Sequence, residues 1–156
     1  MRDLVLATLG VGANLGDPRT AVRKAIEDLA RLPHTGVVAV SSLYGSAPLD
    51  ADGPDYVNAV VQVRTALSPD ALLAALQAIE QQAGRERPYR NAPRTLDLDI
   101  LLYGADRVDR AHLQIPHPRM WQRAFVVVPM AEIAPDLVDP GHLQAVAGQA
   151  LHRLHG

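Results

Sequence analysis

The 156-residue sequence contains no cysteine and only one lysine, one phenylalanine and one tryptophan. Without cysteine, the chain cannot form a disulfide, a thiolate metal site or a cysteine nucleophile. The sequence holds no apolar run near the roughly 20 residues that cross a bilayer, so no membrane-spanning segment is expected. A short apolar run at residues 4–13 imitates a signal-peptide core, but Asp3 interrupts the basic leader. We interpret the run as a strand and expect a cytoplasmic protein.

Neither sign of charge dominates, since 15 basic residues oppose 17 acidic ones and leave a formal charge of −2. Surfaces that bind duplex nucleic acid normally carry a strong basic excess, so no nucleic-acid partner is expected. The hydrophobic share of 48% suffices for a core, and no repeat, low-complexity tract or linker divides the chain. We therefore predict one domain over residues 1–156, and a monomer because nothing in the sequence forces assembly.

Almost all of the positive charge is arginine, because Lys24 is the only lysine. The planar guanidinium group suits bidentate contact with carboxylates and phosphates. A lysine-poor, alanine-rich composition also arises from genome composition alone. The placement of the arginines therefore carries more information than their number.

The hydrophobic pattern alternates between the periods of strands and helices. Asp17 before Pro18 and Ser68 before Pro69 are typical helix beginnings. The order is strand, helix, strand, strand, helix, strand, which predicts an α+β fold: a ferredoxin-like βαββαβ two-layer sandwich with C-terminal helical additions. The predicted strands cover residues 4–11, 35–44, 56–64 and 96–103, and the predicted helices begin at residues 18, 69, 125 and about 142.

Alternation along two strands suggests that the sheet has two different faces. In the third strand Tyr56, Asn58 and Gln62 share one side, opposite a row of valines and alanine. In the last strand, Leu96, Leu98, Ile100 and Leu102 lie opposite Asp97 and Asp99. We expect the apolar side to carry both helices and the polar side to be available for a ligand. A merely solvated second face is also common in antiparallel sheets.

Asp97 and Asp99 form the sharpest local motif. As alternate strand residues they project to the same side, about 7 Å apart along the strand, and such a pair can hold Mg²⁺ against substrate phosphates. Alone, the pair is also typical of a solvated strand. However, four arginines precede it, and a histidine and two arginines follow it: Arg85, Arg87, Arg90, Arg94, His117, Arg119 and Arg123. This combination favours phosphoryl transfer without a P-loop or a kinase glycine loop.

Seven segments, taken in their order along the chain, resemble the 6-hydroxymethyl-7,8-dihydropterin pyrophosphokinase family of folate biosynthesis. The resemblance runs from about Leu6 to Leu137, and each segment is weakly specific alone. The segments are Gly12-Ala13-Asn14-Leu15-Gly16, Ser41-Ser42-Leu43-Tyr44, Pro54-Asp55-Tyr56-Val57-Asn58, Ile79-Glu80-Gln81-Gln82-Ala83-Gly84-Arg85, Pro93-Arg94-Thr95-Leu96-Asp97-Leu98-Asp99-Ile100-Leu101, Pro116-His117-Pro118-Arg119-Met120 and Glu132-Ile133-Ala134-Pro135.

The resemblance implies a ferredoxin-like fold and transfer of the β,γ-diphosphate of ATP to the pterin's hydroxymethyl group, with release of AMP. It implies that Asp97 and Asp99 bind two Mg²⁺ ions. The implied ATP-binding residues are Glu80, Arg85, Arg90, Arg94, His117 and Arg123, and Arg85, Arg87 and Arg94 join the two aspartates as catalytic residues. The implied pterin-binding residues are Gly12, Ser46, Pro48, Leu49, Tyr56, Asn58 and Phe125.

These roles agree with the chemistry of the side chains. Tyr56 and Phe125 can stack on a flat heterocycle, and Asn58 offers both a donor and an acceptor to an amino-oxo ring. Ordinary core packing also accounts for a lone phenylalanine. No residue stands out as a general base, so alignment, charge compensation and exclusion of water have to suffice.

Some positions depart from the family pattern: Asn91 and Ala92 replace a frequent Trp-Gly, Ala47 a proline, Pro118 an aromatic residue and Ala13 a serine. These departures bear on affinity and on lid closure over the pterin by the loops 45–55 and 84–95, not on the reaction.

Two other functions stay open. One is a ferredoxin-like binding or regulatory module, for which the acidic pair beside arginines is unneeded, and the other is a nucleotidyl transferase, which would release pyrophosphate.

Overall fold

The computed structural model describes residues 3–14, 16–47, 55–84 and 96–154. The first half of the fold comprises β1 (Val5–Ala13), α1 (Pro18–Ala30), β2 (Thr35–Val40), β3 (Tyr44–Ser46), β4 (Tyr56–Thr65), α2 (Pro69–Gly84) and β5 (Asp97–Tyr103). It is followed by β6 (Val108–Arg110), β7 (Leu113–Ile115), the 3₁₀ turn η1 (Met120–Gln122), α3 (Ala124–Ile133), the 3₁₀ turn η2 (Pro135–Leu137), α4 (Pro140–Ala145) and β8 (Leu151–Arg153).

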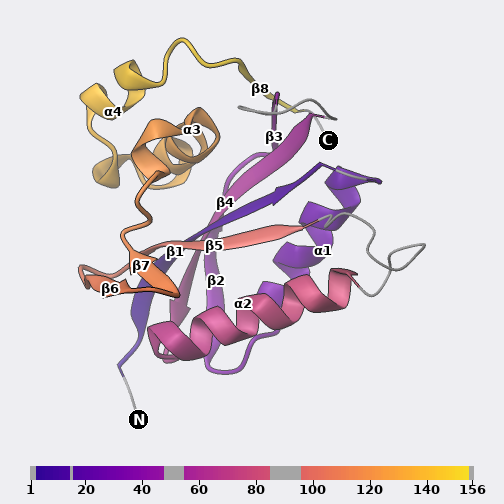
Figure 1. The fold of residues 1–156 in the computed structure, drawn as a ribbon, viewed down its shortest axis with the longest axis vertical. Coiled ribbons are helices and arrows are strands. Elements are labelled where there is room, and N and C mark those ends of the chain that lie inside the picture. The colour runs from indigo at the N-terminus through magenta and orange to yellow at the C-terminus, as the bar shows by residue number, and fades with distance from the viewer. Residues whose placement is uncertain (1–2, 15, 48–54, 85–95, 155–156) are drawn as a thin grey trace.

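The central sheet is antiparallel, with strand order β5-β1-β4-β3-β8 and β2 paired to β4 as well. The predicted βαββαβ arrangement is confirmed (Figure 1). Both helices begin where the sequence indicated, because the Asp17 carboxylate accepts the Thr20 N–H at 3.2 Å and the Ser68 hydroxyl accepts the Ala71 N–H at 3.1 Å. No helix among the residues described has the length and apolar character needed to span a membrane.

The single strand predicted at residues 35–44 is wrong, because the chain forms two strands there. Both β2 and β3 pair with β4, along different parts of its length. Between them, Ser41 exchanges hydrogen bonds with Val60: its N–H donates to the Val60 carbonyl at 2.9 Å, and its hydroxyl accepts the Val60 N–H at 2.9 Å. The serine side chain thus replaces a ladder bond where the strand bends.

The C-terminal additions are only partly helical. Helix α3 lies close to its predicted range, and α4 begins at Pro140, two residues before the predicted His142. Two features were not predicted: the hairpin formed by β6 and β7, and the short strand β8, which pairs with β3 at the edge of the main sheet. The end of the described chain is therefore part of the sheet.

The core divides into two apolar clusters on opposite sides of the sheet. Helices α1 and α2 pack on one side, against alternate residues such as Leu9, Val61 and Leu98. Helix α3 lies on the other side of the sheet (Figure 1). There, residues of η1 and α3 pack against Val60 and Leu101. The second face was predicted to be polar and available for a ligand. It is polar only in part, since α3 covers one region through apolar contacts and a cavity occupies the rest.

A β-bulge in β5 changes the direction of the side chains after Ile100. Thr8 pairs with Leu102 but Leu9 pairs with Ile100, so Leu101 is the extra residue. Leu101 belongs to the apolar cluster around η1 and α3, which is called the α3 cluster below. Leu102 also packs against this cluster, whereas the alternation predicted that Leu102 would face α1 and α2. The fully buried Tyr103 faces α1 and α2 in its place.

Candidate active site

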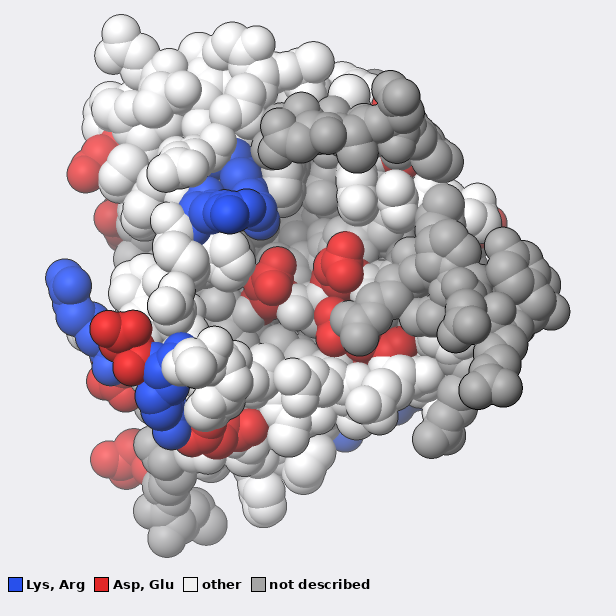
Figure 2. All heavy atoms as spheres, viewed as in Figure 1, with Lys and Arg blue, Asp and Glu red and all other residues white. Residues whose placement is uncertain are grey.

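A cavity of about 520 Å³ lies on the part of the second sheet face that α3 leaves open. It extends past the edge strand β5 to one side of α2. Figure 2 shows acidic side chains inside a hollow on this face and a basic group on its rim below α3. The lining combines residues of β1, β3, β4, α2, β5 and the start of α3: Gly10, Val11, Gly12, Ser46, Ala47, Tyr56, Asn58, Ala59, Leu73, Gln77, Glu80, Asp97, Leu98, Asp99, Leu101, Arg123, Phe125 and Val126.

The two aspartates of β5 lie beside a part of the cavity floor that carries no side chains. Asp97 pairs with Gly12 of β1, and Asp99 pairs with Gly10. Because glycine has no Cβ, the backbone of β1 is accessible next to both carboxylates. The alternation of β5 therefore places two acids on one wall with open space beside them.

Glu80 fixes the backbone between these two acids. Its carboxylate accepts a hydrogen bond from the Leu98 N–H at 2.8 Å, and Leu98 is the residue between Asp97 and Asp99. Glu80 belongs to α2, on the same side of the helix as Leu73 and Gln77, which also line the cavity. Positions 73, 77 and 80 follow helical spacing, so this wall of the cavity is one stripe of α2.

Asn58 presents a buried amide at the opposite side of the floor. The residue is 4% exposed, and its Nδ2 donates to the buried Ser46 hydroxyl at 2.8 Å. Asn58 pairs with Gly12, and a Cβ on Gly12 would lie 3.1 Å from the Asn58 Oδ1. Tyr56 lies two residues before Asn58 and pairs with Ser46. A polar amide edge beside an aromatic ring is suited to a flat, hydrogen-bonding heterocycle.

Arg123 and Phe125 form the wall nearest α3. The Arg123 guanidinium carbon lies 5.4 Å from the centre of the Phe125 ring, within the range of a cation–π contact. Both side chains line the cavity that Asp97 and Asp99 also line. The cavity therefore holds positive and negative groups on different walls.

His117 borders this region without being part of the lining. Its Nδ1 accepts the Arg119 N–H at 3.2 Å, which leaves Nε2 to carry the proton of the neutral ring. Burial lowers the pKa of His117, the charge of Asp99 raises it, and the charges of Arg123 and Arg119 lower it further; the net direction is downward. A neutral His117 can donate one hydrogen bond through Nε2.

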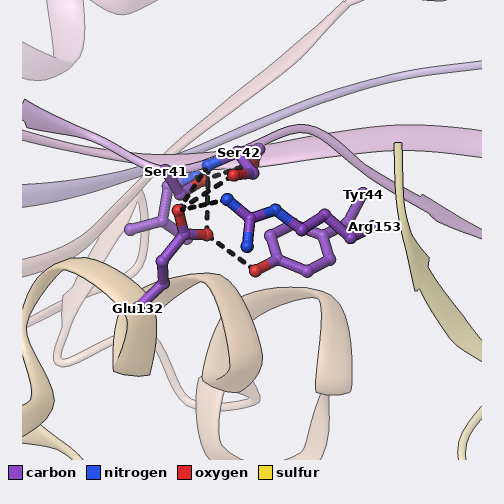
Figure 3. A network of polar contacts seen from close by, with 6 residues as sticks. Ser41, Ser42, Tyr44, Glu132 and Arg153 are labelled. Atoms are coloured by element: carbon purple, nitrogen blue, oxygen red, sulfur yellow. Dashed lines mark hydrogen bonds and ion pairs between the residues drawn. The ribbon is translucent and has the colours of Figure 1, made fainter. Parts of the chain in front are cut away.

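A polar network joins two of the sequence motifs noted above, Ser41-Ser42-Leu43-Tyr44 and Glu132-Ile133-Ala134-Pro135 (Figure 3). The Glu132 carboxylate accepts from the Ser42 N–H at 3.1 Å, from the Ser42 hydroxyl at 2.9 Å and from the Tyr44 hydroxyl at 2.6 Å. Arg153 of β8 lies 3.7 Å from the same carboxylate. The last turn of α3 is thereby tied to the two strands at the sheet edge.

The pKa values of this network follow from the same bonds. Burial raises the pKa of Glu132, but the hydrogen bonds from Tyr44 and Ser42 outweigh burial, and the pKa is lowered overall. Burial and the hydrogen bond to Glu132 raise the pKa of Tyr44 to about 12. The network is therefore most stable with a charged Glu132 and a neutral Tyr44.

The structure brings most of the predicted site residues together. The cavity is lined by Glu80, Asp97, Asp99 and Arg123 from the nucleotide and metal set, and by Gly12, Ser46, Tyr56, Asn58 and Phe125 from the pterin set. His117 lies beside them. Six of the predicted site residues lie outside the described part of the chain: Pro48, Leu49, Arg85, Arg87, Arg90 and Arg94. Asn91 and Ala92, which depart from the family pattern, lie outside it as well.

Several lining residues were not predicted from the sequence, chiefly Gly10, Leu73, Gln77 and Leu101. Gly10 lies two residues before Gly12 on the same side of β1, so strand alternation could have found it. Leu73 and Gln77 precede Glu80 at helical spacing. Leu101 reaches the cavity only because of the bulge, for which the sequence carries no clear signal.

Residues 8–135 match the model of the family described as 7,8-dihydro-6-hydroxymethylpterin-pyrophosphokinase. The 2-amino-4-hydroxy-6-hydroxymethyldihydropteridine pyrophosphokinase of Pseudomonas aeruginosa is 51% identical over 133 residues, 85% of this chain and 82% of that protein. The enzyme of the same name from Haemophilus influenzae is 47% identical over 138 residues, 88% of this chain and 86% of that protein.

A similar fold occurs in a solved structure of Plasmodium falciparum HPPK-DHPS, crystallised with pterin and p-hydroxybenzoate. The TM-score is 0.66 at 13% sequence identity, and the match covers 86% of this chain. This chain spans only 40% of that longer protein. At this identity the likeness concerns the fold alone.

Proposed function

Because the chain belongs to the 7,8-dihydro-6-hydroxymethylpterin-pyrophosphokinase family, we propose that the cavity between β1, β4, β5 and α3 is its active site. The chain is an enzyme of folate biosynthesis that transfers the β,γ-diphosphate of ATP to the hydroxymethyl group of 6-hydroxymethyl-7,8-dihydropterin. The observation that supports the cavity most strongly is the arrangement of its walls. An acidic pair faces a glycine floor, and the buried amide of Asn58 lies at the other side of that floor.

The pterin is proposed to bind at the Asn58 side. Asn58 would read the amino-oxo edge of the ring, and Ser46 would hold the Asn58 amide in one orientation through the 2.8 Å hydrogen bond. Tyr56 and Phe125 would contact the faces of the ring. Gly12 keeps the floor clear because any side chain there would press on the Asn58 amide. Pro48 and Leu49 are proposed to complete this pocket.

The triphosphate of ATP is proposed to bind between the acidic pair and Arg123. Asp97 and Asp99 would hold two Mg²⁺ ions, and their geometry fits that role: two carboxylates on one wall, beside open space for phosphates and water. Mg²⁺ in such sites takes one or two protein carboxylates and fills its shell with water and phosphate oxygens. When bound, the ions would supply charge neutralisation on the phosphates.

Arginines and a histidine would complete the contacts with the phosphates. Arg123 lines the cavity with its guanidinium oriented over Phe125. His117 would donate through Nε2, as its hydrogen bond from Arg119 allows. Glu80 would act on the acids through the Leu98 backbone. By family resemblance, Arg85, Arg90 and Arg94 are proposed to bind ATP, and Arg85, Arg87 and Arg94 are proposed to assist catalysis.

In the reaction, the pterin hydroxymethyl oxygen forms a bond to the β-phosphorus, and the bond between that phosphorus and the oxygen bridging to the α-phosphate breaks. The electron pair of the broken bond leaves with AMP, and the hydroxyl proton passes to solvent or to a phosphate oxygen. The protein contributes alignment of the two substrates and cationic groups at the phosphates. The transfer as described requires no general base.

We further propose a monomeric enzyme in the cytoplasm, where ATP is abundant, that needs no nucleic-acid partner.

The experiment that tests this function identifies the nucleotide product. The protein is incubated with ATP, Mg²⁺ and 6-hydroxymethyl-7,8-dihydropterin, and the nucleotides are separated by ion-exchange chromatography. AMP that forms only when the pterin is present is the expected result. Free pyrophosphate as product would instead indicate a nucleotidyl transferase, and binding without turnover would indicate a binding module.

A further inference from the structure

The backbone changes direction at Arg123, between the 3₁₀ turn η1 and helix α3. Arg123 has extended dihedral angles, φ −121° and ψ 116°, although it lies between two helical segments. This change of direction decides where the Arg123 side chain enters the cavity. The position of the Arg123 guanidinium group, which is proposed above to contact the phosphates, therefore depends on what holds this bend.

One side chain is hydrogen-bonded to the backbone on both sides of Arg123. The Gln149 Oε1 accepts the N–H of Ala124, the residue after Arg123, at 2.9 Å. The Gln149 Nε2 donates to the carbonyl of Gln122, the residue before Arg123, at 2.7 Å. A single amide thus spans the bend and uses both its acceptor and a donor.

The start of α3 needs this partner because its own sequence supplies none. The residue at the N-cap position is Arg123, whose side chain makes no capping hydrogen bond. A helix leaves its first N–H groups without intrahelical acceptors, and a side-chain oxygen normally satisfies one of them. Gln149 supplies that oxygen from 25 residues further along the chain.

Gln149 is itself held from two sides. Its own N–H donates to the carbonyl of Val146, which is 2% exposed within the α3 cluster, at 3.0 Å. Two residues later, β8 begins and pairs with β3. Gln149 therefore belongs to an anchored segment. It also lies beyond residues 8–135, the part of the chain that matches the family model.

We propose that Gln149 is a positioning residue that sets the direction of Arg123 toward the triphosphate of ATP. The proposal rests on the proposed function, because it assumes that Arg123 binds the nucleotide. Gln149 does not touch substrate; it acts through the two peptide groups that flank Arg123. The C-terminal segment of this chain thereby contributes to the nucleotide side of the site.

The test compares Gln149→Leu, Gln149→Glu and Arg123→Ala with the double variant Arg123→Ala/Gln149→Leu. The exposed Gln144 of α4 gives the matched control Gln144→Leu. Steady-state kinetics give separate KM values for ATP and for the pterin. Hydrogen exchange of the Ala124 amide reports on its hydrogen bond to Gln149. Gln149→Glu keeps an acceptor for Ala124 but places a carboxylate against the Gln122 carbonyl, so the second variant remains informative if the leucine variant folds poorly.

The expected result for Gln149→Leu is a rise in KM for ATP of about tenfold, with faster exchange at Ala124 and little change in KM for the pterin. Gln149→Glu changes KM for ATP in the same direction, and Gln144→Leu behaves as the unchanged chain. In the Arg123→Ala background, the leucine substitution adds no further loss. A purely structural role would instead give equal losses for both substrates and additive losses in the double variant, which would overturn the proposal.

An unchanged KM for ATP in Gln149→Leu would also overturn it. If Arg123→Ala itself leaves KM for ATP unchanged, the assigned role of Arg123 falls, and the Gln149 proposal falls with it. Failure of the pyrophosphokinase function is a different result, because the unsubstituted protein would then form no pterin-dependent AMP.

Discussion

The Glu80 carboxylate on α2 accepts the backbone N–H of Leu98 on β5 at 2.8 Å. Leu98 separates Asp97 from Asp99, so this bond connects a helix to the short stretch of strand that carries both acids. Among the described residues, β5 is an edge strand of the sheet and pairs with β1 alone. Edge strands lack a second ladder to hold them, and the bond from α2 compensates for that on the free side.

Replacing Glu80 by leucine should therefore lower kcat/KM by about tenfold to a hundredfold, because the position of the acids is no longer fixed. Glu80→Gln keeps an oxygen that can accept the Leu98 N–H and should retain more of the rate. Steady-state assays of both variants check this, with the exposed Gln81→Leu on the same helix as control. Equal losses in the glutamine and leucine variants would mean that the charge of Glu80 matters, and not its bond to Leu98.

The floor beside Asn58 should tolerate no side chain at position 12. A Cβ on Gly12 would lie 3.1 Å from the Asn58 Oδ1, so the amide must shift in Gly12→Ala. We expect KM for the pterin to rise by about tenfold while KM for ATP changes little. Gly36→Ala in β2 is the control, since a Cβ there meets nothing within 4 Å. A normal KM for the pterin in Gly12→Ala would contradict the role given to Asn58.

The bond between Tyr44 and Glu132 should make the stability of the chain depend on alkaline pH. The pKa of Tyr44 is raised from 10.0 to about 12, because of burial and the hydrogen bond to Glu132. A group whose pKa is raised on folding contributes stability that is complete below its unfolded pKa and is lost as the pH rises through the folded value. Tyr44→Phe should thus cost about 1 kcal/mol at neutral pH.

The difference in unfolding free energy between the unsubstituted chain and Tyr44→Phe should then narrow between pH 10 and about 12. Urea denaturation at a series of pH values measures this difference directly. A difference that stays constant over this interval would show that the Tyr44 hydroxyl does not titrate as the network requires.

Strand alternation and helix signals were enough to predict β1, β2, β4 and β5 of the sheet, both main helices and the side of β5 on which Asp97 and Asp99 lie. Those features depend on neighbours within one element, which the sequence records directly. The break at Ser41 depends on a hydrogen bond to Val60, and the start of α3 depends on Gln149. Such contacts join residues far apart in the sequence, and no local sequence pattern indicates them.

The same distinction applies to the site. Strand alternation placed Tyr56 and Asn58 on one side of a strand, and the family resemblance singled them out as pterin-binding residues. Gln77 was missed although it lies one helical turn before Glu80. The coverage of the second sheet face by α3 could not be predicted, because α3 is apolar around most of its circumference and gives no preferred face. The bulge at Leu101 likewise follows from how β5 meets β1.

The proposed active site depends most on the acidic pair, so the decisive measurement is the rate of AMP formation by Asp97→Asn. Asparagine keeps the size of the side chain and removes its charge. We expect turnover to fall by at least about a hundredfold, with circular dichroism and the thermal midpoint close to those of the unsubstituted chain. The exposed Asp109→Asn on β6 should keep full activity. A folded Asp97→Asn protein that forms AMP at the normal rate would contradict the assignment of this cavity as the active site.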